Sequence, residues 1–500
     1  MAIVAGVDAS TQSSTVELRD ADSGVLLGGG RALHPLTYPP VSEQRPEAWW
    51  EAFTSALGAA ATDAGVAISD IDAISVAGQC HGLVMLDADG RPLRAAKLWN
   101  DTTSAPQSER MVAELGGDAW AEAVGSVPIA AFTISKLAWM AEHEPEVLAR
   151  TARIMQPHDY LTFRLTGRAV TDRSEASGTG YYAAHEGRWR LDLLDRFVAP
   201  RDWAPMLSTV LGPDEPAGTV CAAAADELGL RRDAIVGAGG GDQHLGAVGL
   251  GLRDGDVAYS IGTSGVVMTM NEQPVFDGSG IVTGVANAVG GYLPLACTLN
   301  STKVTDWAAR TLGVGIEELG AMALSVDAEG APPAGRPVFA AYLDGERTPN
   351  RPLATGTIAG LTTATSREEI ARAAFEGVLF GMLNAHEHLQ TVGADADGEV
   401  MVMGGGARGI AYRQILADLL GRPVVVRDVE ESTARGAAIQ AAAVLRGRPV
   451  AELAEELRPA ALVATEPRDS DYTAVRERYR TLAEWTGTDR AGDDAIGGVR

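Results

Sequence analysis

The chain has 500 residues, of which 46% are apolar, and its 41 Lys and Arg residues face 66 Asp and Glu residues, which gives a formal net charge of -25. This length and composition predict a globular protein with two large domains, because one hydrophobic core rarely spans so many residues. The negative charge opposes binding to nucleic acids and to anionic membranes.

Neither a membrane anchor nor an export signal is predicted. The chain contains no run of about 18 uncharged apolar residues, and residues 1–4 enter a predicted strand without a basic segment or a cleavage site. We therefore expect a cytoplasmic protein. The cysteines at 80, 221 and 297 are too few and too scattered for a disulfide framework or a zinc site, so we expect reduced thiols.

A hairpin is predicted at the start of the chain. Strands over residues 3–8 and 15–18 flank the turn sequence Asp8-Ala9-Ser10-Thr11-Gln12-Ser13. Such a turn can direct backbone N–H groups and hydroxyls at a polyphosphate, and Asp8 at the strand end can hold the associated metal ion. An ordinary hairpin turn is the alternative interpretation.

A helix is then predicted to residue 64, followed by a strand over 71–77 that ends at Gly78-Gln79-Cys80-His81-Gly82. Alternation of strands and helices favours a mixed α/β sheet, in which ligands bind beyond the strand ends, and this places His81 at a candidate site. A turn residue is the other interpretation of His81. Trp99-Asn100-Asp101 offers an aromatic face and two polar groups for a sugar, or else a buried Trp followed by a helix cap.

The strand predicted over 235–238 stops at Gly239-Gly240-Gly241-Asp242. Three glycines permit close approach of a ligand to Asp242, although an Asp that caps the next helix would share this pattern. We place a domain boundary near residues 249–252. A second hairpin follows at once, with strands over 256–261 and 266–270 around Gly262-Thr263-Ser264-Gly265. Its recurrence at the start of each half indicates a duplicated nucleotide-binding architecture.

In the second half, Ser366 and Glu369 form a capping box before a long apolar helix pattern. A strand over 399–403 then meets Gly404–Gly409, which fits G-x-G-x-x-G, and Asp428 lies about twenty residues on, as in dinucleotide-binding proteins. An NAD-dependent dehydrogenase is therefore one alternative. However, one convincing further helix, capped by Ser432, precedes the polar tail, so we assign the glycines to adenosine binding. The tail is predicted to hold one helix, over 471–485, and a disordered end.

These motifs together resemble those of the FGGY carbohydrate kinases, and the segments 78–82 and 98–101 are most similar to the family's D-xylulose kinases. Further segments of this kind are 132–140, 159–161, 345–349 and 356–376. The resemblance implies a two-domain, actin-like (ribonuclease-H-like) α/β fold with a cleft between the domains. It also implies ATP with Mg²⁺ and phosphorylation of a ketopentose at its terminal hydroxyl. The corresponding domains are residues 1–249 for the sugar and the catalytic base, 250–465 for ATP, and a tail over 466–500.

Carried over motif by motif, the resemblance assigns Asp242 as the general base. The sugar contacts it implies are Cys80, His81, Gly82, Trp99, Asp101 and Gln243. The phosphates would be held by Thr11, Ser13, Gly262, Thr263 and Ser264, the adenine end by Gly404, Gly405 and Gly406, and the metal by Asp8. Related kinases commonly have Met and Asn where this chain has Cys80 and Gln243, and Gly and Lys where it has Ser10 and Thr15.

The motifs leave several alternatives open. Ribulose, glycerol, gluconate or a deoxy sugar could replace xylulose as the substrate, and a non-catalytic sugar sensor could keep the same fold without turnover. A homodimer is expected from the family resemblance alone.

Overall fold

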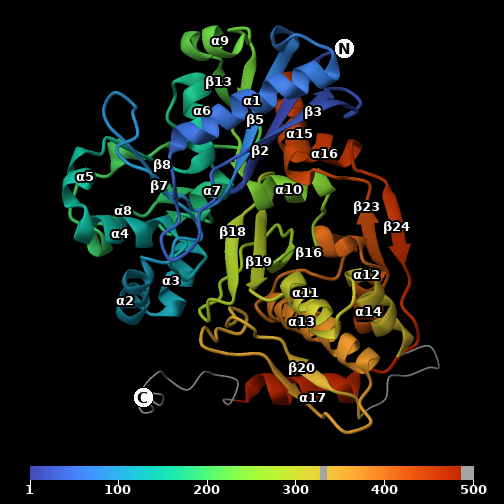
Figure 1. Ribbon diagram of the computed structural model, residues 1–500. Helices are drawn as coiled ribbons and strands as arrows, with labels where there is room; N and C mark the ends of the chain where they lie inside the picture. Colours follow the sequence, from blue (N-terminus) through green and yellow to red (C-terminus); the bar gives the residue numbers. More distant parts are fainter. Residues whose placement is uncertain (327–334, 486–500) are drawn as a thin grey trace. The chain divides into compact units, whose positions relative to one another are not determined.

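The computed structural model describes residues 1–326 and 335–485 (Figure 1). The chain packs into two compact units. Unit 1 comprises Met1–Leu252, Asn271–Leu293 and Val429–Pro459, and unit 2 comprises Arg253–Met270, Pro294–Asp428 and the described residues from Ala460 onward. The functional domain limits at 249 and 465 stay predictions. The end of the chain that was expected to be disordered, residues 486–500, lies outside the described residues.

The main sheet of unit 1 has the order β13-β14-β5-β1-β2-β3. Its strands are β1 (Ile3–Ala9), β2 (Ser13–Asp20), β3 (Leu26–Leu33), β5 (Ile71–Gly78), β13 (Pro216–Thr219) and β14 (Ile235–Gly237). The first predicted hairpin is confirmed, because β1 and β2 are antiparallel with Asp8 opposite Thr15. Strand β5 runs parallel to β1, and β14 runs parallel to β5.

Side-chain alternation explains how this sheet is covered on both faces. Odd-numbered residues of β1 belong to a core with helix α1 (Pro46–Ala64), which ends at residue 64 as predicted, whereas Val4 belongs to a core with α15 (Ser432–Arg446). Gly6 of β1 lets α15 come close, because a Cβ there would lie 2.8 Å from Cβ of Ala438. The prediction that Ser432 caps its helix is wrong, since Ser432 is the first helical residue and Glu431 occupies the cap.

Unit 1 contains further helices and short strands, several of which carry site residues. The helices are α2 (Ala105–Leu115), α3 (Gly117–Val124), α4 (Thr133–His143), α5 (Pro145–Arg150), α6 (Pro157–Thr166), α7 (Arg173–Ser177), α8 (Leu191–Phe197), α9 (Ala222–Leu228), α10 (Asp242–Leu250) and α16 (Val450–Glu456). The strand β15 (Gly240–Gly241) pairs in parallel with the end of β5.

The sheet of unit 2 follows the path β19-β17-β16-β22-β23-β24. Its strands are β16 (Val257–Ile261), β17 (Gly265–Thr269), β19 (Tyr292–Thr298), β22 (Val400–Met403), β23 (Val424–Arg427) and β24 (Ala461–Thr465). Strands β16 and β17 form the second predicted hairpin, and β22 runs parallel to β16 as β5 does to β1. Each unit is therefore built on three antiparallel strands followed by two parallel ones, which confirms the predicted duplication of the fold. The edge strand β24 was not predicted.

The helices of unit 2 are α11 (Thr302–Leu312), α12 (Ile316–Ser325), α13 (Arg367–Thr391), α14 (Ile410–Leu420) and α17 (Thr473–Glu484). The capping box of α13 is confirmed: Oγ of Ser366 accepts from the Glu369 N–H at 3.2 Å, and Oε2 of Glu369 accepts from the Ser366 N–H at 2.9 Å. The glycine-rich segment after β22 forms a short 3₁₀ helix, η3 (Gly405–Arg408), before α14 begins. Among the described residues, no helix has the length and apolar character needed to cross a membrane.

Candidate active site

Asp242 lies where the parallel strands of unit 1 end. Strand β15 pairs with Ala77 and Gly78 at the end of β5, and Asp242 is the first residue of α10, immediately after β15. Because neighbouring parallel strands end at the same edge, the segment after β5 meets the start of α10 there. The Cys80 thiol accordingly donates a hydrogen bond to Oδ1 of Asp242 at 3.4 Å.

Helix α15 holds the loop before Asp242 in place. Gln440 of α15 accepts from the Gly239 N–H at 2.8 Å and donates to the Gly239 carbonyl at 3.1 Å. The hydroxyl of Thr433 donates to the backbone carbonyl of Asp242 at 3.2 Å. Gly436 of α15 leaves room for α10 to pack closely, since a Cβ there would lie 2.9 Å from the Gly249 nitrogen. These contacts position Asp242 through the backbone and leave its carboxylate oxygens unengaged.

Burial raises the pKa of the Asp242 carboxyl, and hydrogen bonds from the Gln243 N–H at 2.7 Å and from Cys80 oppose this rise. Both donors reach Oδ1. No contact of the described residues engages Oδ2, so this oxygen is available to accept a proton from a ligand. The environment therefore makes Asp242 a better base than an exposed aspartate.

Asp8 at the end of β1 is the second carboxylate of this site. Burial raises the pKa of Asp8 to about 7, helped by the negative charges of Asp242 and Glu431, whereas a hydrogen bond from Ser10 at 2.6 Å and the charge of Arg31 lower it. The carboxylate oxygens of Asp8 are ligands of the kind that Mg²⁺ prefers, so this residue fits the metal that the resemblance implies.

The turn after β1 contacts the segment that was predicted to bind sugar. The indole N–H of Trp99 donates to Oγ1 of Thr11 at 2.9 Å, and Trp99 remains 43% exposed. An exposed indole in a polar setting offers the aromatic face expected for a sugar. Ser13 is instead buried, and its hydroxyl accepts from Nε of Arg31 at 3.1 Å.

His81 has an unusual backbone conformation. Its φ of 62° places it in the left-handed region, which a non-glycine residue rarely adopts. Its carbonyl accepts from Nζ of Lys136 at 2.7 Å, and its Nδ1 lies 2.8 Å from the Gly178 carbonyl. The ring packs on Phe132 with 4.9 Å between centroids. These contacts orient the imidazole and offset the backbone strain, as is common at binding sites.

If His81 contacts the sugar as the resemblance implies, we expect Lys136→Met to raise KM for the sugar by roughly 10-fold, which corresponds to loss of about 1.4 kcal/mol of binding. Lys136 is fully buried in α4, burial lowers the pKa of its ammonium to about 7, and its bond to the His81 carbonyl makes it a candidate positioning residue. The test is a comparison of KM values for sugar and for ATP. A rise in both, or in neither, would contradict the positioning role.

Two of the predicted sugar contacts have structural roles in the fold. Asp101 is fully buried, and its carboxylate accepts from the Ser42 N–H at 2.9 Å and the Thr103 N–H at 3.0 Å and lies 3.3 Å from Nζ of Lys97. Gly82 packs on Pro157, where a Cβ would come within 2.5 Å of the ring. Contact of either residue with a sugar stays a prediction.

In unit 2, the turn Gly262–Ser264 and the glycines after β22 lie around Ile261. Thr263 and Ser264 are exposed, and the Gly262 N–H donates to the Ser264 carbonyl at 3.1 Å. Gly404 has a φ of 83°, and a Cβ on it would lie 2.8 Å from the carbonyl oxygen of Ile261. Gly405, by contrast, is exposed and has open space around it. The close approach of the two backbones therefore requires Gly404, and Gly405 faces outward.

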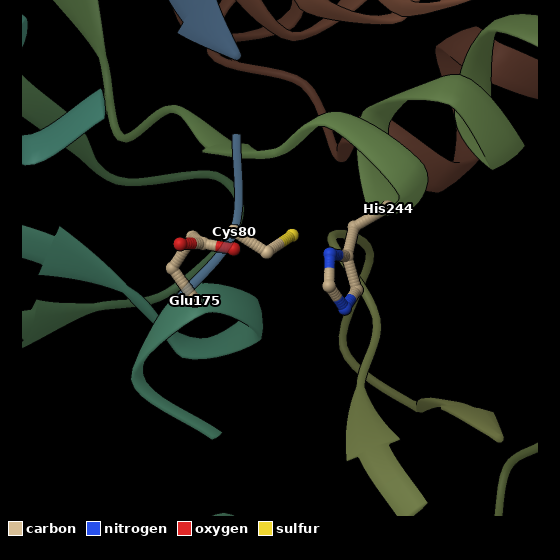
Figure 2. Close-up of side chains that lie close together, drawn as sticks. All are labelled: Cys80, Glu175 and His244. Carbon is tan, nitrogen blue, oxygen red and sulfur yellow. The ribbon is translucent and has the colours of Figure 1, made fainter. Parts of the chain in front are cut away.

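The structure adds residues that the sequence did not indicate. Glu175 of α7 and His244 of α10 are buried beside Cys80 (Figure 2). Lys136 contacts the His81 carbonyl, and the charge of Glu431 raises the pKa of Asp8. No local pattern marks Glu175, which lies 95 positions from Cys80. The one signal for His244 was its place two residues after Asp242.

Family comparison agrees with this geometry. Residues 3–249 match the N-terminal domain, and residues 257–445 the C-terminal domain, of the FGGY family of carbohydrate kinases. The chain belongs to this family. It is accordingly a carbohydrate kinase, and the family membership rules out the alternative of an NAD-dependent dehydrogenase.

This FGGY kinase is similar to curated proteins along nearly its whole length. It is 41% identical over 462 residues to the xylulose kinase of Streptomyces coelicolor, and the matched residues cover 92% of this chain and 91% of that relative. It is 40% identical over 483 residues to the xylulose kinase of Streptomyces rubiginosus, with 96% of each chain covered. Among solved structures, the xylulose kinase of Bifidobacterium adolescentis matches with a TM-score of 0.84 and 36% identity, over 96% of this chain and 99% of that one.

Proposed function

We propose that this FGGY kinase transfers the γ-phosphoryl group of ATP to the terminal hydroxyl of D-xylulose and releases D-xylulose 5-phosphate and ADP. The observation that carries the proposal is the sequence identity of 41% and 40% to two xylulose kinases, over nearly the full length of the chain. The arrangement of Asp242, Cys80 and His81 at one sheet edge supports it. Cytoplasmic location and a homodimer stay predictions.

Asp242 is the proposed general base. Oδ2 accepts the proton of the attacking hydroxyl as the new O–P bond forms and the bond from the γ-phosphorus to the bridging oxygen of ATP breaks. The raised pKa favours this acceptance, and the contacts from Gln243 and Cys80 keep Oδ1 fixed during the transfer. The loose transition state of phosphoryl transfer demands little early proton removal, so positioning of the hydroxyl contributes most of the rate.

Sugar binding is assigned to Cys80, His81, Trp99 and Gln243. Their side chains supply a thiol, an imidazole, an exposed indole and an amide, which suit a hydroxylated ligand. Asp101 and Gly82 are proposed to support this region through packing and buried hydrogen bonds.

Phosphate and nucleotide binding are assigned to the two hairpin turns and to the glycines after β22. Thr11 and Ser13 of the first turn, together with Gly262, Thr263 and Ser264 of the second, are proposed to contact the phosphates. Asp8 is the proposed ligand of Mg²⁺, which when bound neutralises charge on the phosphate oxygens. Gly404, Gly405 and Gly406 are proposed to line the adenine end: the exposed Gly404 and Gly405 would let a nucleotide lie close to the backbone, and the buried Gly406 lets the segment pack on Ile261.

Gly404→Ala is expected to raise KM for ATP by roughly 10-fold, because the added Cβ meets the Ile261 carbonyl and strains the left-handed backbone. Gly421→Ala is the matched control: Gly421 is also left-handed, with φ 62°, but has nothing within 4 Å. Both variants should lose some thermal stability. An equal KM for ATP in the two would argue against nucleotide binding at Gly404.

The proposed function is tested by ADP release from ATP and Mg²⁺ with a panel of acceptors. The panel holds D-xylulose, L-xylulose, D-ribulose, L-ribulose, glycerol and gluconate. We expect the highest kcat/KM with D-xylulose. A higher kcat/KM with another acceptor would support kinase activity but assign a different substrate. If protein that binds ATP releases no ADP with any acceptor, the non-catalytic sugar sensor would be favoured.

One observation favours the alternative of a different sugar. Cys80 and Gln243 replace residues common in related kinases. The Cys80 side chain contacts Asp242 directly, whereas Gln243 reaches Asp242 through its backbone N–H, which any residue would supply. A changed side chain next to the base can alter which hydroxyl lies nearest to Oδ2, and the panel therefore includes both pentulose epimers.

A further inference from the structure

Three side chains with metal-binding groups converge beside Asp242. Cys80 follows β5, Glu175 lies on α7 and His244 lies on α10, and one ligand atom from each falls within 4.8 Å of the other two. Figure 2 shows the Cys80 sulfur between the Glu175 carboxylate and the His244 ring. The three come from separate elements, so the tertiary fold alone brings them together.

Gly241 leaves the space on which these groups converge. A Cβ at this position would lie 2.8 Å from Sγ of Cys80 and 2.5 Å from Oε1 of Glu175, and closer still to Nδ1 of His244. Any other residue would fill the space between the three donors. The space left beside Gly241 is therefore lined by sulfur, oxygen and nitrogen atoms.

The buried donors lack protein partners. Glu175 is 1% exposed and His244 is 3% exposed. Neither carboxylate oxygen of Glu175 and neither ring nitrogen of His244 has a hydrogen-bond partner in the described part of the chain. The Cys80 thiol has a single proton, which it directs at Asp242, so it does not serve Glu175 at the same time. Leaving such buried groups without partners is unfavourable, and a bound ligand would offset that cost.

The donor set identifies the kind of ligand. Thiolate sulfur, imidazole nitrogen and carboxylate oxygen are together the ligands of zinc and similar divalent ions, whereas Mg²⁺ prefers oxygen alone. A divalent cation also offsets the negative charge of the neighbouring Asp242, which a neutral sugar does not. Three protein ligands leave a fourth position open to water or another ligand.

We propose that Cys80, Glu175 and His244 bind one zinc-class divalent cation at a site separate from the Mg²⁺ that accompanies ATP. On binding, the Cys80 thiol releases its proton to solvent and the sulfur coordinates as a thiolate. Because Cys80 is also an assigned sugar contact and donates to the proposed base, the bound cation and the sugar exclude each other. This second part, inhibition that competes with sugar, rests on the proposed function.

The direct test uses Co²⁺ as a spectroscopic probe of the purified, metal-free full chain, without sugar or ATP. We expect one equivalent of Co²⁺ to give a thiolate-to-cobalt charge-transfer band in the near ultraviolet, and Zn²⁺ to displace it. Cys80→Ser should abolish the band, and Glu175→Gln should weaken Co²⁺ binding by at least about 10-fold. Cys221→Ser and Cys297→Ser are matched controls that should keep the band, and circular dichroism verifies that every variant is folded.

Absence of a stoichiometric band in the wild-type chain would overturn the proposal, as would a band that survives Cys80→Ser and disappears in Cys221→Ser. The kinetic arm measures turnover of D-xylulose with added Zn²⁺ at fixed Mg²⁺-ATP, with an expected rise in apparent KM for sugar and an unchanged kcat. If no sugar is turned over but Co²⁺ still binds through Cys80, the proposed function fails and the metal site stands. If sugar is turned over and Co²⁺ does not bind, the metal site fails and the proposed function stands.

Discussion

Replacement of Asp242 by asparagine is expected to lower kcat by about 10²–10⁴-fold, the usual contribution of a positioned general base. KM for the sugar should change by only a few-fold, because Asn keeps the size of the side chain and the contact from the Gln243 N–H to Oδ1. Burial raises the pKa of Asp242 as it does that of Asp8, so at pH 8 the melting temperature of Asp242→Asn should equal or exceed that of the wild type.

The measurement is steady-state turnover of the best acceptor in the panel, with Asp192→Asn as the matched control. Asp192 also lies in the first turn of a helix, α8, but it is exposed and pairs with Arg190. The control should retain wild-type kcat. Near-normal turnover in Asp242→Asn would assign the base to another residue.

Asp8→Asn is expected to abolish most activity and, at pH 8, to raise the melting temperature by about 1–3 °C. The sign follows from the pKa of Asp8, which rises from 3.8 unfolded to about 7 in the folded chain. The folded state therefore binds the proton more tightly, and its stability falls as pH rises from about 4 through 7. Above pH 7 the wild type retains a costly buried charge, which Asn removes. The gain in melting temperature should shrink at pH 5.

Asp20→Asn, in β2 of the same hairpin, is the control with the opposite sign. Hydrogen bonds from Ser23 lower the pKa of this exposed aspartate, so its carboxylate stabilises the folded state above its unfolded pKa. The substitution should leave the melting temperature unchanged or lower it at pH 8, with activity intact. Melting curves at pH 5 and pH 8 test both variants, and a lower melting temperature for Asp8→Asn at pH 8 would contradict the charge argument.

Local sequence patterns predicted the elements that lead to the site. Both hairpins, the helix Pro46–Ala64 and the capping box at Ser366 and Glu369 are confirmed, because strand alternation, turn residues and cap residues act over a few positions. The predicted start of α15 was wrong by one residue, since helix ends are defined only to within one or two residues and no side chain caps this one. Strand β24 was missed because its residues are partly exposed at a sheet edge, where apolar alternation is weak.

The sequence by itself determined the family, the order of strands and helices, and Asp242 as the proposed base, since these depend on motifs contiguous in the chain. Only the tertiary structure decided how those residues are used. It buried Asp101 against Lys97, held His81 in a left-handed conformation through Lys136, and brought Glu175 and His244 to Cys80. These contacts join separate elements, Cys80 and Asp242 being 162 residues apart, and distances of that kind arise only when the parallel strands of one sheet end at a common edge.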